Sequence, residues 1–155
     1  MYRLSTALIA TIAFLVGTSA RADFIPWSYT WTADPQVSDG AGAGIGFFTT
    51  AAGTISTSKD VAGGVVLQAF APDSSPGHVL NDAPYNVAMH ITDKVSGIAG
   101  DFAFSGKLSG DINAGSVTNV FNAPETQSLT LGQNAYAVTI GSYVPPGSPS
   151  SNVWG

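Results

Sequence analysis

Cysteine is absent from the sequence. The chain therefore has no thiol chemistry and no disulfide, and its fold must be stabilised by packing alone. Its 155 residues are enough for one domain with a substantial core. The sequence Asn-x-Ser/Thr is also absent, so the usual acceptor for N-linked glycans is missing.

Charge is scarce as well. Charged residues make up 10% of the chain, with ten acidic residues against five basic ones. No basic stretch is present that would bind a nucleic-acid backbone or an anionic membrane surface. We therefore expect no nucleic-acid partner. The polar surface must consist mainly of Ser, Thr, Asn, Gln and Gly, which suits contact with neutral polymers outside the cell.

Complete catalytic and metal-binding motifs are missing. Neither His78 nor His90 has a second ligand at zinc spacing, and no G-x-S-x-G sequence marks a serine nucleophile. The glycines of 40–46 recur at every second position, which does not fit a dinucleotide-binding fingerprint. We predict a non-enzymatic protein with no catalytic residue, no cofactor and no metal. A hydrolase using His78 with the nearby Asp73 and Asp82 is a weaker hypothesis.

The first 22 residues have the three parts of a secretory signal peptide. Arg3 precedes an apolar run at 8–16, and Ala-Arg-Ala at 20–22 matches a cleavage site. The run is shorter than the roughly 20 residues of a membrane-spanning helix, so we expect no membrane span after cleavage. We predict a cleaved signal helix over 1–22 and a single secreted domain over 23–155, extracellular or on the cell surface, with the periplasm as an alternative.

Glycine and proline divide the rest of the chain into short alternating runs. Alternation of apolar and polar residues is typical of half-buried strands, and no stretch shows a sustained helical period. The predicted strands cover residues 27–33, 45–50, 54–58, 65–70, 85–92, 101–108, 116–121, 128–131 and 135–143. They predict an all-β fold, an antiparallel two-sheet β-sandwich, with a β-barrel as the alternative.

Some pairings can be predicted as well. We expect one hairpin between 45–50 and 54–58, and another between 128–131 and 135–143 around Gly-Gln-Asn. The run at 65–70 is apolar on both faces, which favours a central strand.

The sharpest local feature is an aromatic strand face. Trp27, Tyr29 and Trp31 alternate with small hydroxyl residues. Three rings on one face suit stacking against sugar rings, so these three residues are the candidate ligand-binding site. The alternative is that they form the core face of the first strand, since buried aromatic rings dominate protein cores.

Two segments carry a resemblance. The sequence "LTLGQNAYAVTIGSYVPPGSPSSN" at 129–152 and the sequence "FIPWSYTWTADP" at 24–35 resemble those of uncharacterised secreted bacterial β-sandwich proteins. Many of those carry a final strand and a C-terminal PEP-CTERM sorting tail, and both are absent here. The resemblance implies a secreted sandwich and brings no assigned activity.

The last residues look like the beginning of another strand. Val153 and Trp154 follow a Pro-rich loop, and we expect the strand at 135–143 to find its neighbour in residues beyond Gly155. The domain is then truncated at its C-terminus, or residues 153–154 form a short terminal strand. A sheet edge without its neighbour favours self-association through that edge.

These features together predict a secreted, non-enzymatic structural or adhesive protein of the extracellular space or cell surface. Its expected partner is an extracellular polysaccharide or a surface protein. The alternative is a carbohydrate-binding module that uses the strand aromatics.

Overall fold

The computed structural model describes residues 24–57, 62–122, 124–151 and 155. These residues form ten strands and no helix, and none of them builds a helix able to cross a bilayer. The predicted signal peptide and the predicted strand start at 153–154 lie outside the described residues. Every strand pair is antiparallel.

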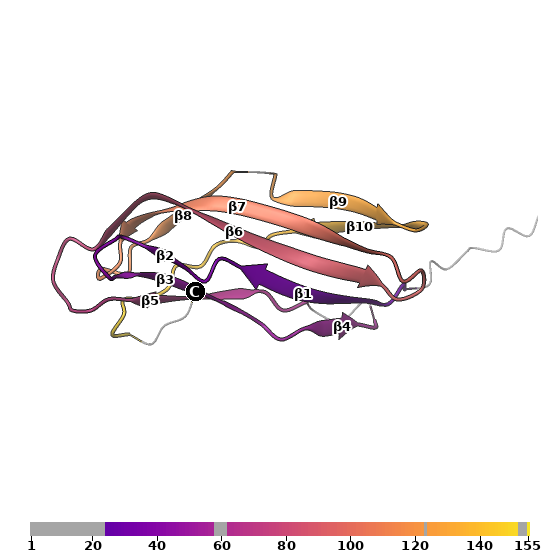
Figure 1. Ribbon diagram of the computed structural model, residues 1–155, viewed down its shortest axis with the longest axis horizontal. Helices are drawn as coiled ribbons and strands as arrows, with labels where there is room; N and C mark the ends of the chain where they lie inside the picture. Colours follow the sequence, from indigo (N-terminus) through magenta and orange to yellow (C-terminus); the bar gives the residue numbers. More distant parts are fainter. Residues whose placement is uncertain (1–23, 58–61, 123, 152–154) are drawn as a thin grey trace, which may run out of the picture.

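One layer is a five-stranded sheet built around the long β6–β7 hairpin, which runs most of the length of the molecule (Figure 1). The hairpin pairs residue by residue except for a bulge between Leu80 and Ala83. In spatial order the strands are β4 (Gly53–Ile55), β1 (Trp27–Ala33), β6 (Val79–Asp93), β7 (Ala99–Asp111) and β8 (Thr118–Phe121).

The second layer consists of two smaller sheets. One contains β2 (Gln36–Ser38), β3 (Gly44–Thr49) and β5 (Val65–Phe70), and the other β9 (Thr126–Leu131) and β10 (Asn134–Thr139). The ring of Phe47 stacks on that of Tyr85 with centroids 5.2 Å apart. Leu129 and Leu131 pack over Gly100 at the other end of the large sheet. The sheets are open at their edges, so the fold is the predicted antiparallel β-sandwich and not a barrel.

Strict alternation along β6 and β7 builds the core. Phe102, Phe104 and Leu108 of β7 are at most 3% exposed, as are Met89 and Ile91 of β6. Their neighbours in sequence are mostly exposed on the outer face. The predicted strand at 101–108 is confirmed, and Phe102, Phe104 and Leu108 share its buried face, because successive side chains of a strand point to opposite faces.

Two predicted arrangements of the middle of the chain are wrong. Residues 45–50 and 54–58 do not form a hairpin, since β3 pairs with β2 and β5 whereas β4 pairs with β1. The amide of Thr50 still donates to Gly64 next to β5, and the chain then crosses to the other layer, where β4 pairs with β1. The strand at 65–70 lies at a sheet edge, so most of its residues are only half-buried.

The C-terminal region confirms the predicted hairpin. The hairpin at 126–139 forms, with Gly132 at φ 64° in its turn. Gly155 pairs with Leu67 of β5, and the described partner of β10 is β9. β10 ends at Thr139, and the prolines in the segment 144–149 lack an amide hydrogen and could not extend its ladder.

Candidate functional site

A groove of about 540 Å³ runs between the two small sheets of the second layer. The inner faces of β1 and β6 form its floor. Val65 and Leu67 of β5 line one side, and Val138 and Ile140 line the other. None of the described residues that line it is charged. We call this space the β5 groove.

The predicted aromatic site lies partly in this groove. Trp27 and Trp31 are half-buried and line it, whereas Tyr29 is 7% exposed and belongs to the core. The indole of Trp31 donates to the carbonyl of Gly63, and the amide of Gly63 donates to the Tyr29 hydroxyl at 2.6 Å. The aromatic strand thus anchors the segment that leads into β5. A molecule in the groove would touch the two indoles and not Tyr29.

Two tyrosines line the far end of the groove. Tyr85 donates its hydroxyl to Asn119 Oδ1 at 2.7 Å, and Tyr143 donates to the carbonyl of Val117 at 3.2 Å. Burial raises the pKa of Tyr85, and burial together with Tyr85 raises the pKa of Tyr143 to about 12. Both phenols therefore stay neutral under ordinary conditions, and the groove stays uncharged.

A buried carboxylate holds β10, which forms one wall of the β5 groove, against the large sheet. Asp93 has no exposed surface; it accepts hydrogen bonds from the Asn134 side chain at 2.6 Å and from the amides of Val95 and Ser96. The Asn134 contact, followed by the Ser96 amide, lowers the pKa of Asp93 to about 2. Burial, and then the Asp93 carboxylate, raises the pKa of Tyr136 to about 12. This network ties the β9–β10 hairpin to the β6–β7 turn.

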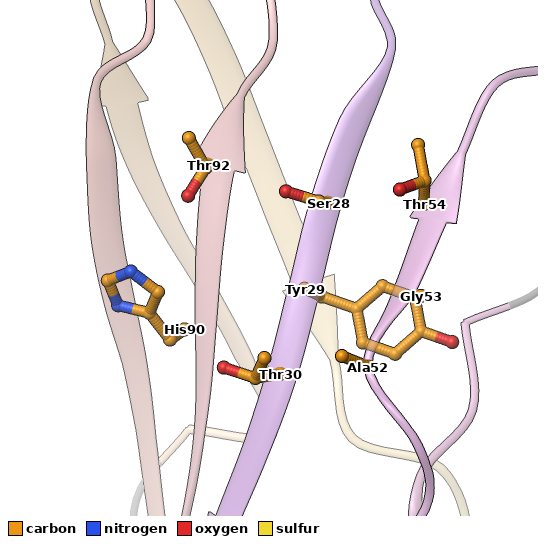
Figure 2. Close-up of a pocket in the computed structure, with 8 residues that line it drawn as sticks. All are labelled: Ser28, Tyr29, Thr30, Ala52, Gly53, Thr54, His90 and Thr92. Carbon is orange, nitrogen blue, oxygen red and sulfur yellow. The ribbon is translucent and has the colours of Figure 1, made fainter.

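The outer face of the large sheet carries a shallow polar depression of about 240 Å³. Figure 2 shows Ser28 and Thr30 on β1 between Thr54 on one side and Thr92 on the other. Their hydroxyl groups follow from the alternation of β1, whose aromatic residues occupy the inner face. The depression offers weak polar contacts and no enclosed space.

His90 borders this depression without completing a catalytic set. Thr30, His90 and Asp101 lie side by side across β1, β6 and β7 in the register of the sheet. The imidazole points away from β1 (Figure 2), and its Nδ1 lies 2.8 Å from Asp101 Oδ1. No hydrogen bond joins the ring to the Thr30 hydroxyl among the described residues. A nucleophile needs its base within hydrogen-bond reach. Thr30, His90 and Asp101 therefore do not form a catalytic triad.

His78 lies at the opposite end of the sandwich from the β6–β7 turn, between two carboxylates. Its Nδ1 is 2.6 Å from Asp39, and its Nε2 is 3.4 Å from Asp73. Asp39, then Asp73, raises the pKa of His78. The predicted neighbour Asp82 instead accepts from Ser109. Asp39 also accepts hydrogen bonds from the amides of Ala41 and Ala43. The cluster therefore stabilises the loops that carry these residues.

Sequence reasoning missed the groove and the partner of His78. Asp39 is far from His78 along the chain, and no spacing rule links them. The groove depends on which strands lie at sheet edges, and alternation alone does not determine that. The sequence carried one signal for the groove. Residues 65–70 are apolar on both faces, so the strand presents apolar side chains to the groove even though it lies at a sheet edge.

The structure therefore defines an antiparallel β-sandwich with an open, uncharged groove between the sheets of one layer. Within the described ranges, no three His, Asp or Glu side chains are placed to hold a metal ion. Comparison with protein-family models, with curated proteins and with solved structures found no match. The function has to be inferred from the groove itself.

Proposed function

We propose that the chain is a secreted, non-enzymatic structural or adhesive module that binds a surface protein through the β5 groove. The observation that carries the proposal is the 540 Å³ apolar groove lying beside a sheet edge. Exposed apolar surface of this kind marks interaction sites in soluble proteins. Half-buried Val65, Leu67 and Val138 supply that surface.

Two further features support binding over catalysis. The groove has no charged lining residue, and the phenols at its far end are held neutral by burial. The charged clusters at His78 and His90 lie outside the lining. The predicted signal peptide and the low charge support a role outside the cell.

A bead-adhesion assay tests this function. Beads coated with residues 23–155 should adhere to the surface of the producing cells. Val138→Glu places a charge in the groove and should abolish adhesion, as should Val65→Glu on the opposite wall. Ala135→Glu adds the same charge on the exposed face of β10 and should leave adhesion unchanged. Thermal melts confirm that each variant is folded.

Two outcomes would contradict the proposal. Adhesion that survives both groove charges would place the binding surface elsewhere. Turnover of a glycan or peptide substrate would make the protein an enzyme, and variants of His78 and Asp39 would then identify its site.

A carbohydrate-binding module is the second candidate, and the placement of Trp27 and Trp31 favours it. Both indoles line the groove, and sugar rings stack on such faces. Saturable binding in a glycan screen that is lost in Trp31→Ala, and kept in Thr30→Ala on the outer face of the same strand, would support it. The Trp31→Ala variant must melt cooperatively, because the indole also holds Gly63.

A further inference from the structure

The β6–β7 turn, residues 94–98, exposes apolar side chains at one end of the molecule (Figure 1). Val95 is 71% exposed, more than any other large apolar side chain that the structure describes, and Ile98 is 47% exposed. A single exposed apolar residue is common on protein surfaces and needs no explanation. Two of them within one five-residue turn form a small apolar tip.

The segments on either side support this tip. The amide of Lys94 donates to the carbonyl of Pro26 at 3.0 Å, so the residues before β1 run beside the turn. Phe24, on that segment, is 39% exposed and adds a third apolar side chain at the same end. The β9–β10 turn adjoins the other side, since a Cβ added to Gly132 would lie 3.7 Å from Cδ1 of Ile98.

Every amide of the turn donates a hydrogen bond within the protein. Besides the first amide, described above, those of Val95 and Ser96 donate to Oδ1 of Asp93 at 2.7 and 3.0 Å. The amide of Gly97 donates to the Asp93 carbonyl, and that of Ile98 donates to Oγ of Ser96. The turn is therefore held in one conformation. It has no free amide to desolvate when its side chains enter an apolar environment, where an unpaired amide is costly.

The charges around the turn favour an uncharged lipid surface. Asp93 is buried, and Lys94 is the one charged residue of the turn and is exposed. A lysine can keep its ammonium among lipid phosphates while its stem lies along apolar surface. The next acidic residue along β7 is Asp101, three residues and about 10 Å from Ile98. The whole chain has a formal net charge of −5, so an anionic membrane would repel it.

The size of the tip favours lipid over a protein partner. Stable protein interfaces bury roughly 800 Å² on each partner, far more than three partly exposed side chains can supply. Insertion into a lipid interface needs no complementary surface, and its strength follows the apolar area that is buried. A turn that is already ordered also loses little conformational entropy on binding.

We propose that the β6–β7 turn inserts Val95 and Ile98 into the interfacial region of a zwitterionic phospholipid bilayer, with Lys94 at the level of the phosphates. None of residues 94–98 lines the β5 groove. The turn is thus a second contact site, which holds the module at a membrane surface whether or not the groove is occupied.

Vesicle sedimentation tests the insertion. Residues 23–155 should co-sediment with phosphatidylcholine vesicles at about millimolar lipid. Val95→Ser should weaken this binding about tenfold, because it removes most of an exposed apolar side chain from the lipid. Val120→Ser makes the same change on β8, where Val120 is 66% exposed and lies opposite Lys107, about 26 Å along β7 from its first residue. This control should bind as tightly as the unchanged chain.

A fluorophore reports which surface enters the lipid. The chain has no cysteine, so Val95→Cys provides a single attachment site. An environment-sensitive fluorophore there should brighten and shift to shorter wavelength when phosphatidylcholine vesicles are added. The same fluorophore on Ala114→Cys, in the exposed turn after β7, should not respond.

Several results would overturn the proposal. Absence of co-sedimentation would reject insertion, and equal losses in Val95→Ser and Val120→Ser would place the contact elsewhere. A fluorophore response at Ala114→Cys and not at Val95→Cys would do the same. Binding that requires phosphatidylglycerol in the vesicles would make the contact electrostatic. A dimer in sedimentation equilibrium that Val95→Ser dissolves, without vesicle binding, would make a second copy the occupant of the tip.

The groove and the turn are tested separately. Val138→Glu, which charges the β5 groove, should leave vesicle binding unchanged. Loss of vesicle binding in this variant would move the lipid contact to the groove and overturn the assignment to the turn. Thermal melts confirm that each variant is folded.

Discussion

The two sides of the sandwich differ in how completely they bury the same kind of residue. Beneath the β6–β7 hairpin, Phe102 and Leu108 are at most 1% exposed. Between β5 and β10, Leu67, Val138 and Ile140 are also apolar and also inward, yet they are only half-buried. Both sides follow the same alternating pattern.

The two sides differ in how their strands are paired and not in the type of side chain that points inward. On the closed side, β6 and β7 have hydrogen-bonded neighbours on both edges. On the open side, β5 has β3 on one edge and a single described residue, Gly155, on the other. The groove lies where the described strands of the second layer leave a space between β5 and β10.

The largest effect should come from the closed side. Phe104 is 3% exposed, and Phe104→Ala should destabilise the fold by about 3–5 kcal/mol, because it leaves a cavity in a packed core. Urea unfolding followed by tryptophan fluorescence measures the loss. Ala103→Ser, on the exposed face of the same strand, is the control and should stay within about 0.5 kcal/mol. A loss below about 1 kcal/mol for Phe104→Ala would mean that β7 faces the other way.

The equivalent change on the open side should be much weaker. Leu67→Ala removes a half-buried side chain from the groove wall, so we expect a loss of about 1 kcal/mol. The same urea experiment compares it directly with Phe104→Ala. If Leu67→Ala were as damaging as Phe104→Ala, the groove would be closed in solution and the contrast between the two sides would disappear.

The sequence predicts the closed side better than the open side. Alternation at 101–108 and 85–92 identifies the inner faces of β7 and β6, because a strand facing a core must repeat every two residues. The same rule places Trp27 and Trp31 inward, and it places the hydroxyl residues of the candidate polar depression outward.

Alternation does not reveal which strands are neighbours. The loop after β3 looks like a hairpin connection, but it carries the chain to the other layer, where β4 pairs with β1. The three residues of β2 are too few to show a period. The groove could not be predicted for the same reason, since it depends on the edge position of β5. The contact of His78 with Asp39 depends on loops from two elements meeting in space.

Acid should loosen the open side. Because the pKa of Asp93 is lowered to about 2, below the value of about 3.9 for an unfolded chain, its ionised form stabilises the fold. That contribution is complete above about pH 4 and is lost as the pH falls towards the folded pKa. Asn134→Ala removes the strongest partner of Asp93 and should move the acid transition to higher pH.

Circular dichroism melts between acid and neutral pH measure this shift. Gln133→Ala, a change of the neighbouring turn residue, is the control and should leave the transition in place. An acid transition in Asn134→Ala that coincides with the wild-type transition would show that Asp93 does not hold the β9–β10 hairpin. Loss of adhesion together with the hairpin would link this contact to the wall of the groove.

The smallest effect should come from the opposite end, where His78 joins the β2–β3 turn to the loop before β6. Asp39 and Asp73 raise the pKa of His78, so the protonated ring stabilises the fold. This contribution is complete below the unfolded pKa of about 6.5 and decreases as the pH rises through the folded value.

Asp39→Asn should lower the His78 midpoint in an NMR titration, and Asp73→Asn should lower it less, because Asp73 is the more distant and more exposed partner. A larger effect of Asp73→Asn would reverse this order and make the exposed carboxylate the main partner. Adhesion should be the same in both variants, since neither residue lines the β5 groove.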